Sequence, residues 1–328
     1  MSEKHAKKQE VVGIILAAGQ GKRMKSSRSK VAHFLLGRSL IEWSMHQFVA
    51  AGVADLVVVL SPSQPEVLEI VSQFSESVSD RCRIIPVFQE VALGTGHAAL
   101  CGVRALELAG RVTGTALIGL GDVPGISCEI LNDLALRKEA DGSSLTVLSF
   151  DAENPYGYGR VLKSAHGQVV AIQEEKDCSP EQRLIRTCNS GFFAGNLQDL
   201  CEFLPKIKQE NAAREFYLTD LPALLTHAGR RVSAYEGVAE DAVLGINSQQ
   251  QLAEAAQRMQ RRVVSALLDS GVQLLNPDQV YIEPSVTFGK NVIVEPFVKL
   301  SGSVHIPDDF CVPSFSRWSE QSDVFKQG

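Results

Sequence analysis

The carboxyl-terminal part of the chain carries a six-residue repeat, and few folds can satisfy such a repeat. Residues 282–311 read IEPSVT, FGKNVI, VEPFVK, LSGSVH and IPDDFC, with apolar residues at the first and fifth places of every unit. Such hexads build a left-handed parallel β-helix with three hexads per coil, because stacked coils bury apolar side chains that a single unit would leave exposed. The pattern covers just under two coils and is lost in SRWSEQSDVFKQG. We therefore expect a short, truncated β-helix.

The amino-terminal half alternates short apolar runs with longer helical stretches. The runs VVGIIL, DLVVVL, CRIIPVF, TALIGL and SLTVLSF are rich in β-branched residues. Their alternation with helices is typical of βαβ units, in which helices cover both faces of a mostly parallel sheet. A strand pair around GRVLKSAHGQVVAIQEE and a strand at CNSGFFAG read as a lid on the same sheet. The expected fold class is α/β, with a Rossmann-like domain and a mixed, mostly parallel sheet.

A helix is expected to connect these two parts. From Ser248 onward the sequence places apolar residues at intervals of three and four, as an amphipathic helix requires. Ser248 and Gln251 form an S-x-x-Q capping box, and Gly271 is a plausible end. The predicted organisation is an α/β domain over 1–246, a connecting helix over 247–275, a β-helix over 276–316 and a tail over 317–328.

Composition narrows the class of protein. A net charge of -6 argues against nucleic acid as a partner, because duplex-binding domains are normally basic. The seven cysteines are odd in number and form no CxxC pair, so we expect reduced thiols and a cytoplasmic location. No apolar run approaches the roughly 18–20 residues of a membrane span. The apolar run after Glu10 reads better as a buried strand than as part of a signal peptide.

A basic, glycine-containing loop follows the first expected strand. It is not a P-loop, and Gly19 and Gly21 are followed by Met24 where a dinucleotide fingerprint has a third glycine. Small residues here leave the backbone N–H groups accessible at the carboxyl end of a strand. From Val11 to Ile41 the chain has six basic residues and no acidic one. The loop is either a solvated basic surface or a cradle for a triphosphate or pyrophosphate.

This loop and the motifs after it resemble the bacterial N-acetylglucosamine-1-phosphate uridyltransferases, whose members usually also carry a C-terminal glucosamine-1-phosphate acetyltransferase. The motifs run in order as LAAGQGKRMKSSRSK, QEVALGTGHAA, GLGDVP, NPYGYGR, IQEEKD, CNSGFF, EFYLTD and GIN, across residues 11–315. The resemblance implies a nucleotidyltransferase that joins UTP and N-acetylglucosamine 1-phosphate into UDP-N-acetylglucosamine, a peptidoglycan precursor for the cell wall, with release of pyrophosphate.

The resemblance also implies a Mg²⁺ site at Asp122 and Asn247. From the residues alone, Asp122 is as readily a turn former. Asn247 could be a helix cap, although the capping box assigns that role to Ser248. An oxygen ligand pair together with substrate phosphates is how proteins usually hold Mg²⁺.

Substrate contacts follow from the same resemblance. Gln89, Gly94 and Thr95 match positions that hold the uridine, whereas QEVALGTGH taken alone is a strand-to-helix turn, and His97 is read as structural. Without the resemblance, Glu174 would be interpreted as part of a solvent-exposed charged surface. The implied catalytic residues are Arg23, Lys30 and Asp122. The implied substrate-binding residues are Leu16, Ala17, Ala18, Gly19, Arg23, Lys30, Gln89, Gly94, Thr95, Gly121, Asp122, Gly159, Glu174, Asn189 and Asn247.

The chain departs from the family pattern at two informative places. Ser29 replaces the usual proline before Lys30, which predicts a less rigid loop, and Leu120 replaces a common tyrosine, which leaves the acceptor open. A short β-helix predicts no acetyltransferase activity and a monomer or weak oligomer. Two alternatives remain: a related nucleotidyltransferase with another acceptor, or a nonenzymatic protein that binds nucleotide sugars and docks on a partner.

Overall fold

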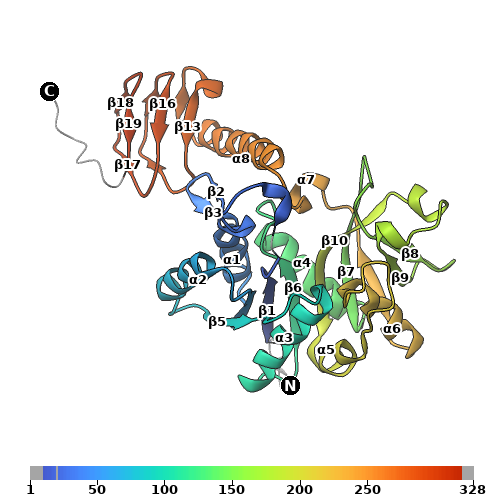
Figure 1. Cartoon of the computed structure of the whole chain (residues 1–328). Coiled ribbons are helices and arrows are strands. Elements are labelled where there is room, and N and C mark those ends of the chain that lie inside the picture. Colours follow the sequence, from blue (N-terminus) through green and yellow to red (C-terminus); the bar gives the residue numbers. More distant parts are fainter. Residues whose placement is uncertain (1–9, 20, 320–328) are drawn as a thin grey trace, which may run out of the picture. The chain divides into compact units, whose positions relative to one another are not determined.

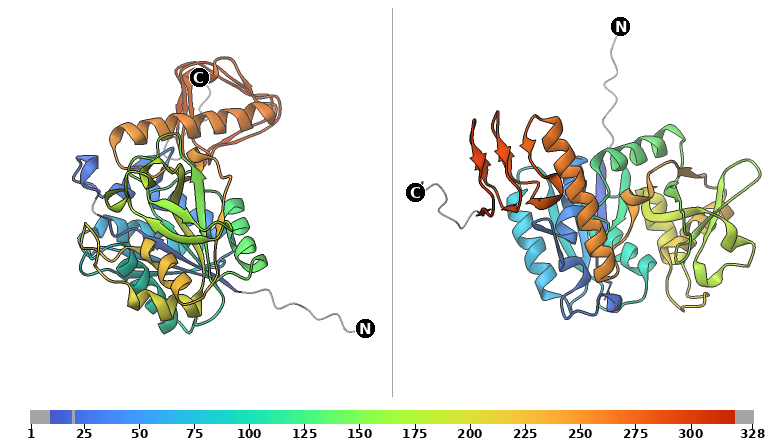
Figure 2. Two further views of the ribbon diagram at one scale, coloured as in Figure 1. Left: turned by 90° about the vertical axis from the view of Figure 1, so that its right-hand side faces the viewer. Right: turned by 90° about the horizontal axis from the view of Figure 1, so that it is seen from above.

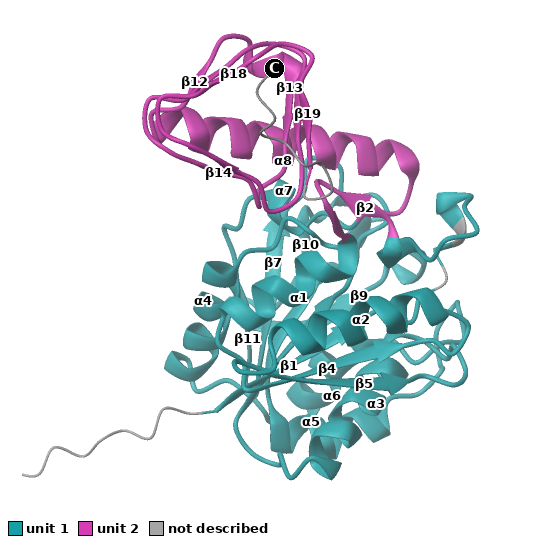
Figure 3. Ribbon diagram, turned by 90° about the vertical axis from the view of Figure 1, so that its left-hand side faces the viewer, with its two compact units in different colours: residues 1–32, 40–245 teal, residues 33–39, 246–328 magenta. Residues whose placement is uncertain are grey.

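The computed structural model describes residues 10–19 and 21–319. The chain forms two compact units (Figure 3). The first unit comprises residues 1–32 and 40–245, and the second comprises residues 33–39 and 246–328. Among the described residues, no helix has the length and apolar character needed to cross a membrane.

The first unit is built on a mixed sheet that has nine strands among the residues described (Figures 1 and 2). At its centre, β1 (Val11–Leu16) lies parallel to β4 (Asp55–Leu60) on one side and to β6 (Thr115–Leu120) on the other. β5 (Arg83–Phe88) continues the sheet beyond β4 in the same direction. These strands match four of the predicted apolar runs.

The other half of the sheet makes it mixed. β10 (Thr187–Asn196) runs antiparallel to both β6 and β7 (Leu145–Asp151), and β11 (Val232–Tyr235) lies parallel to β7. A hairpin of two further strands pairs with β10: β8 (Arg160–Lys163) and β9 (Val169–Gln173). The prediction that the CNSGFFAG strand belongs to a lid is wrong, because β10 lies within the sheet between β6 and β7. The predicted fold class is therefore confirmed for this unit.

Helices bury both faces of this sheet because residues of one strand alternate between two cores. In β4, Leu56 and Val58 belong to one core, and Val57 and Val59 belong to the other. The first core is completed by helices α1 (Leu40–Ala50), α2 (Pro65–Ser77) and α4 (Cys128–Ala140). The second is completed by α3 (Thr95–Leu108), α5 (Leu197–Phe203) and α6 (Leu221–His227). A short helix, α7 (Glu240–Val243), lies near the end of the unit.

The second unit begins with the predicted connecting helix. α8 (Gln249–Asp269) starts after Ser248, whose hydroxyl accepts a hydrogen bond from the N–H of Gln251 at 3.2 Å. The side chain of Gln251 accepts from the N–H of Asn247 at 2.8 Å, one residue earlier than a standard capping box. The helix ends before Gly271, whose φ of +93° suits only a residue without a Cβ.

Short parallel strands stack after this helix, and from β13 onward paired residues lie 18 positions apart. Three ladders form: β12 (Gln273–Leu274), β15 (Ile293–Val294) and β18 (Cys311–Val312); β13 (Val280–Ile282), β16 (Val298–Leu300) and β19 (Arg317–Trp318); and β14 (Thr287–Phe288) with β17 (His305–Ile306). The parallel β-helix is confirmed, and its left-handed sense stays a prediction. Residues 33–39 belong to this unit and hold a small hairpin, β2 (Phe34–Leu35) and β3 (Arg38–Ser39).

The predicted end of the hexad pattern is wrong at Trp318. Arg317 and Trp318 form β19 rather than part of a tail, and Lys299 and Leu300 are their partners. The first hexad place stays apolar and buried at Val312 and Trp318, although the fifth place is lost at Ser316. One buried apolar residue in a hexad, at its first place, is therefore enough to continue the β-helix here. The rest of the predicted tail, residues 320–328, lies outside the described residues.

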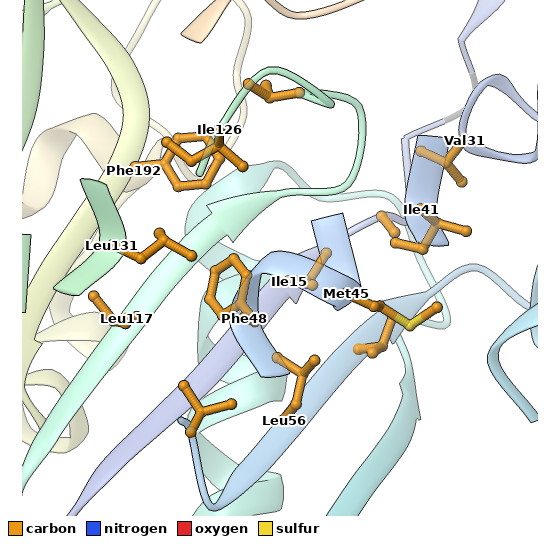
Figure 4. Close-up of a cluster of buried hydrophobic side chains, with 14 of the residues drawn as sticks. Ile15, Val31, Ile41, Met45, Phe48, Leu56, Leu117, Ile126, Leu131 and Phe192 are labelled. Carbon is orange, nitrogen blue, oxygen red and sulfur yellow. The ribbon is translucent and has the colours of Figure 1, made fainter. Parts of the chain in front are cut away.

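Glycine at two positions lets helix α1 approach the sheet of the first unit. A Cβ on Gly13 of β1 would lie 2.6 Å from Cδ1 of Leu56 and 2.7 Å from Cδ1 of Phe48. A Cβ on Gly119 of β6 would overlap the ring of Phe192 and lie 3.0 Å from Cζ of Phe48. Figure 4 shows Phe48 between Leu56 and Leu117, with Phe192 nearby. The ring of Phe48 thus occupies the space above Gly13, and the rings of Phe192 and Phe48 occupy the space above Gly119.

We expect Gly119→Ala to lower the free energy of unfolding by about 1–3 kcal/mol, because the added methyl group overpacks a core that is already full. Urea denaturation monitored by circular dichroism measures the change. In the double variant with Phe192→Leu, the loss attributable to Gly119→Ala should shrink, because the smaller side chain makes room. An equal loss in both backgrounds would contradict this account of the packing.

Candidate active site

The glycine loop leaves the sheet at the carboxyl edge of β1. The N–H of Ala17 donates to the carbonyl of Val59 at 2.9 Å, and the N–H of Gly121 donates to the carbonyl of Leu16 at 3.1 Å. These bonds fix where the loop departs between β4 and β6. Within the described residues, no acceptor bonds to the N–H groups of Ala18 and Gly19. Both groups therefore remain able to donate to a bound anion.

A lysine and an aspartate from two motifs meet at this edge. Lys30 begins a single turn of 3-10 helix, and Asp122 follows β6 by two residues. The ammonium group of Lys30 contacts Oδ2 of Asp122, although the two residues lie 92 positions apart in the chain. Their side chains are only 15% and 11% exposed. The structure thus brings together two of the three residues predicted to be catalytic.

Helix α2 anchors the segment that carries Lys30. The N–H of Ser29 donates to Oε1 of Glu66 at 2.9 Å, and this bond is the main reason that the pKa of Glu66 lies below its usual value. The amide group of Gln64 donates to the carbonyl of Gly19 at 3.1 Å. A proline at position 29 has no N–H and could not bind Glu66. The expectation that Ser29 makes the loop less rigid stays a prediction, and this hydrogen bond is one contact that opposes it.

The charge of Arg23 acts on the hydroxyl group of Tyr158. Met24 is buried beneath the loop, whereas Arg23 is exposed. Burial raises the pKa of Tyr158, the charge of Asp122 raises it further, and the charge of Arg23 lowers it. Tyr158 was not predicted as a site residue from the sequence. The available signal was its position in NPYGYGR, directly before Gly159.

Gln89, Gly94 and Thr95 form a second cluster after β5. The amide nitrogen of Gln89 lies 3.0 Å from the carbonyl oxygen of Gly94. The hydroxyl of Thr95 accepts a hydrogen bond from the N–H of Leu218 at 3.0 Å. A Cβ on Gly94, which has a φ of +111°, would lie 2.5 Å from the carbonyl oxygen of Phe216. The QEVALGTGH and EFYLTD motifs therefore pack directly against each other.

The three residues predicted to hold the sugar also lie together. The N–H of Asn189 donates to the carbonyl of Gly159 at 2.8 Å, and a Cβ on Gly159 would lie 3.5 Å from Oε1 of Glu174. Glu174 is largely buried and accepts a hydrogen bond from the hydroxyl of Thr219 at 2.8 Å; burial raises its pKa. Arg160 is fully buried and pairs with Glu175 at 2.6 Å, which holds the turn that carries Gly159.

Leu120, the residue that replaces a tyrosine, packs next to this cluster. A Cβ on Gly191, which has a φ of +84°, would lie 2.6 Å from Cδ1 of Leu120. The ladder between β10 and β7 shifts register between Asn189 and Phe193, at the same place. The leucine therefore fills apolar space beside the irregular part of β10.

A half-buried carboxyl group, that of Asp220, interacts electrostatically with Glu174. Burial, followed by the charges of Glu174 and Asp177, raises the pKa of Asp220 to about 6. The same neighbours and burial raise the pKa of Tyr217 to about 12. Asp220 was not predicted as a site residue, although the EFYLTD motif that ends with it was recognised.

The predicted metal pair divides between the two units. Asp122 belongs to the first unit, and Asn247 belongs to the second. Among residues 10–19 and 21–319, no cluster of three or more histidine, cysteine, aspartate or glutamate side chains could hold a metal ion. The pairing of Asp122 with Asn247 therefore stays a prediction.

A mostly parallel sheet with a glycine loop, a basic residue and an aspartate at its carboxyl edge is consistent with a nucleotidyltransferase domain, and the match to a known family shows that class. The chain belongs to the family of the MobA-like NTP transferase domain, whose model matches residues 13–270. The match begins at Gly13 in β1 and ends just after α8.

Sequence identity to several named proteins supports membership in this family. The chain is 38% identical to the "Bifunctional protein GlmU" of Corynebacterium aurimucosum over 295 residues, which is 90% of this chain and 60% of the relative. It is 38% identical to the protein of the same name from Pelobacter propionicus, over 91% of this chain and 63% of the relative. It is 36% identical to that of Mycobacterium tuberculosis, over 89% and 58%. The chain thus spans about three fifths of the length of these relatives.

We expect Glu66→Ala to expose the amide of Ser29, because the carboxylate is its hydrogen-bond acceptor. Hydrogen exchange followed by NMR should show this amide exchanging roughly tenfold faster than in the parent protein. Glu66→Gln keeps an acceptor oxygen and serves as the matched control, with most of the protection retained. Unchanged exchange of Ser29 in Glu66→Ala would refute the proposed anchor.

Asp220 should make the protein less stable as pH rises. Its pKa of about 6 in the folded state lies above the ordinary value of 3.8, so folding favours the protonated form. Stability is therefore lost as pH rises through this range. Asp220→Asn should raise the free energy of unfolding by about 1–2 kcal/mol at pH 8 and by almost nothing at pH 4. Urea titrations at both pH values measure this difference. The exposed Asp80 offers a control, since Asp80→Asn should leave the pH profile unchanged.

Proposed function

We propose that this protein transfers a uridylyl group from UTP to N-acetylglucosamine 1-phosphate, which yields UDP-N-acetylglucosamine and pyrophosphate. The contact between Lys30 and Asp122 at the carboxyl edge of the sheet carries the proposal. It joins the end of the LAAGQGKRMKSSRSK motif, which Lys30 closes, to the GLGDVP motif. The similarity to proteins named GlmU over about nine tenths of the chain supports the substrate pair.

The triphosphate would lie along the glycine loop. The N–H groups of Ala18 and Gly19 can donate to phosphate oxygens, and Arg23 and Lys30 supply positive charge. Leu16, Ala17 and Gly121 form the backbone floor on which this loop rests. The uracil would lie against Gln89, Gly94 and Thr95, which follow β5 at the same edge.

The acceptor would lie against Gly159, Glu174 and Asn189. A sugar presents hydroxyl groups and an acetamide, which need paired donors and acceptors. Glu174 is partly buried and already accepts a hydrogen bond from Thr219, so an additional hydroxyl donor from the sugar is an effective partner for its carboxyl group.

The chemistry is a displacement at phosphorus that requires no covalent intermediate. A phosphate oxygen of the sugar phosphate attacks the α-phosphorus of UTP, and the bond from that phosphorus to the oxygen of the β-phosphate breaks. Pyrophosphate leaves with the bonding electrons. Lys30 and Arg23 hold the phosphates in line and neutralise charge that increases in the transition state. The predicted catalytic role of these residues is therefore positioning and electrostatic stabilisation.

A divalent cation, which we propose to be Mg²⁺, fits the donor set at Asp122. Its carboxylate is a buried oxygen donor within reach of the phosphate loop, and only Oδ2 is engaged by Lys30. One or two protein oxygens plus substrate phosphates are typical of Mg²⁺ sites, and Asn247 is the proposed second oxygen ligand. When bound, Mg²⁺ would neutralise charge on the phosphates.

A substrate panel tests the reaction. Purified protein with Mg²⁺, UTP and N-acetylglucosamine 1-phosphate should release pyrophosphate, and CTP or other sugar phosphates should be poorer substrates. Release only with a different sugar phosphate would instead support the alternative of a related nucleotidyltransferase with another acceptor. The same panel with acetyl-coenzyme A and glucosamine 1-phosphate checks the prediction that acetyltransferase activity is absent.

Asp122→Ala distinguishes an enzyme from a binding protein. We expect turnover to fall by about a hundredfold or more, with binding of UTP largely kept, because Asp122 acts on developing charge rather than on the nucleoside. Asp80→Ala, at an exposed position, is the matched control. Behaviour identical to the parent protein in every assay would support the nonenzymatic alternative.

Four further properties stay predictions: a monomeric or weakly associating state, a cytoplasmic location, the absence of a nucleic-acid partner and the absence of a membrane partner.

A further inference from the structure

The side chain of Gln89 is held from two directions. Its backbone N–H donates to the carbonyl of Leu60 at 2.8 Å, which fixes the residue at the end of β5 beside β4. Gln89 is only 5% exposed. Its Nε2 lies 3.0 Å from the carbonyl oxygen of Gly94 and 3.0 Å from Nδ1 of His97. Two residues of the following turn and helix thus contact the same nitrogen.

The chemistry of Gly94 determines which end of the carboxamide points inward. A backbone carbonyl can only accept a hydrogen bond, so the atom that faces it must be the NH₂ group rather than the oxygen. The carbonyl cannot easily move away. Gly96 donates to the carbonyl of Phe216 at 2.7 Å, and Phe216 donates to the carbonyl of Leu93 at 2.8 Å, which brackets the turn.

The orientation of Gln89 in turn determines the tautomer of His97. An NH₂ group can only donate, so Nδ1 of His97 must carry a lone pair and the ring proton must lie on Nε2. Burial, followed by the charge of Arg104 on the same helix, lowers the pKa of His97 and so favours the neutral ring. The ring also lies against Phe216, with centroids 6.3 Å apart.

Both protons of the Gln89 amide are therefore used within the protein. Its carbonyl oxygen is the group left for a ligand, and within the described residues no protein donor bonds to Oε1. An acceptor in this position suits a nucleobase edge with an N–H group, such as the imide of uracil. It repels the lone pair that cytosine has at the equivalent nitrogen.

We propose that His97 is a positioning residue that fixes the carboxamide of Gln89 with its oxygen toward the nucleobase, and so sets the preference for a uracil-type imide over cytosine. This inference rests on the proposed function. Without the acceptor at Nδ1, only the carbonyl of Gly94 holds the NH₂ group inward, so this orientation loses one of its two hydrogen bonds and the flipped orientation becomes more populated. His97, read as structural in the sequence, thus contributes to the choice of nucleotide without touching it.

Two substitutions separate this role from a structural one. His97→Phe keeps a ring beside Phe216 and removes the acceptor, whereas His97→Asn restores an acceptor oxygen near Nδ1. We expect His97→Phe to raise the KM for UTP by roughly tenfold and to reduce the preference for UTP over CTP. The kcat and the KM for the sugar phosphate should stay within about twofold of the parent values. His97→Asn should recover most of the preference.

The outcomes that would overturn the proposal are specific. An unchanged UTP to CTP ratio in His97→Phe would do so, as would equal losses for both nucleotides and the sugar phosphate without rescue by His97→Asn. A melting curve verifies that each variant is folded.

A measurement on the unaltered protein tests the proposal without relying on turnover. Long-range proton–nitrogen NMR spectra of the histidine rings should show His97 with its proton on Nε2, and a proton on Nδ1 would refute the geometry. Calorimetric titration with UTP and CTP alone reports nucleobase preference even if no sugar phosphate is turned over. Absence of turnover with these results intact would count against the proposed reaction, whereas a wrong tautomer or equal affinities would count against His97.

Discussion

The contact between the ammonium group of Lys30 and the carboxylate of Asp122 depends on the pairing of two parallel strands. β1 and β6 pair in register from Val11 with Thr115 to Leu16 with Leu120, so the loops that follow them emerge side by side. A one-residue shift in this register would exchange the two faces of β1 and separate the charges. The apolar cores that hold the register therefore also determine whether a lysine and an aspartate 92 positions apart can meet.

The loops at this edge are held mainly by hydrogen bonds between a side chain of one motif and the backbone of another. Glu66 holds the amide of Ser29, Gln64 holds the carbonyl of Gly19, and Thr95 holds the amide of Leu218. A loop has no ladder of its own, so each such bond satisfies a polar group that would otherwise be solvated or unpaired. The site is consequently a property of several motifs together, and no single loop defines it.

Much of the architecture was predictable from local patterns. β1, β4, β5, β6 and β7 coincide with apolar runs. β1, β4 and β6 are buried on both faces, which favours apolar residues throughout, whereas β5 at the edge of the sheet has exposed positions between buried ones. The six-residue repeat predicted the β-helix, but it did not predict the residue at which the β-helix ends. The fifth hexad place is lost at Ser316, yet Trp318 is only 9% exposed and contacts the ring of Phe310. A large buried ring compensates for a missing apolar position, and a strict pattern does not detect this.

The sequence by itself determined the class of fold, the order of the motifs and the residues to consider at the site, because periodicity and motif spacing are local properties. Only the tertiary structure decided how those residues act on one another. The anchoring of Ser29 by Glu66 and the contact between Gln89 and His97 depend on which groups approach within a few ångströms. Hydrogen bonds and charge interactions fall off over such distances, so spacing along the chain carries little information about them.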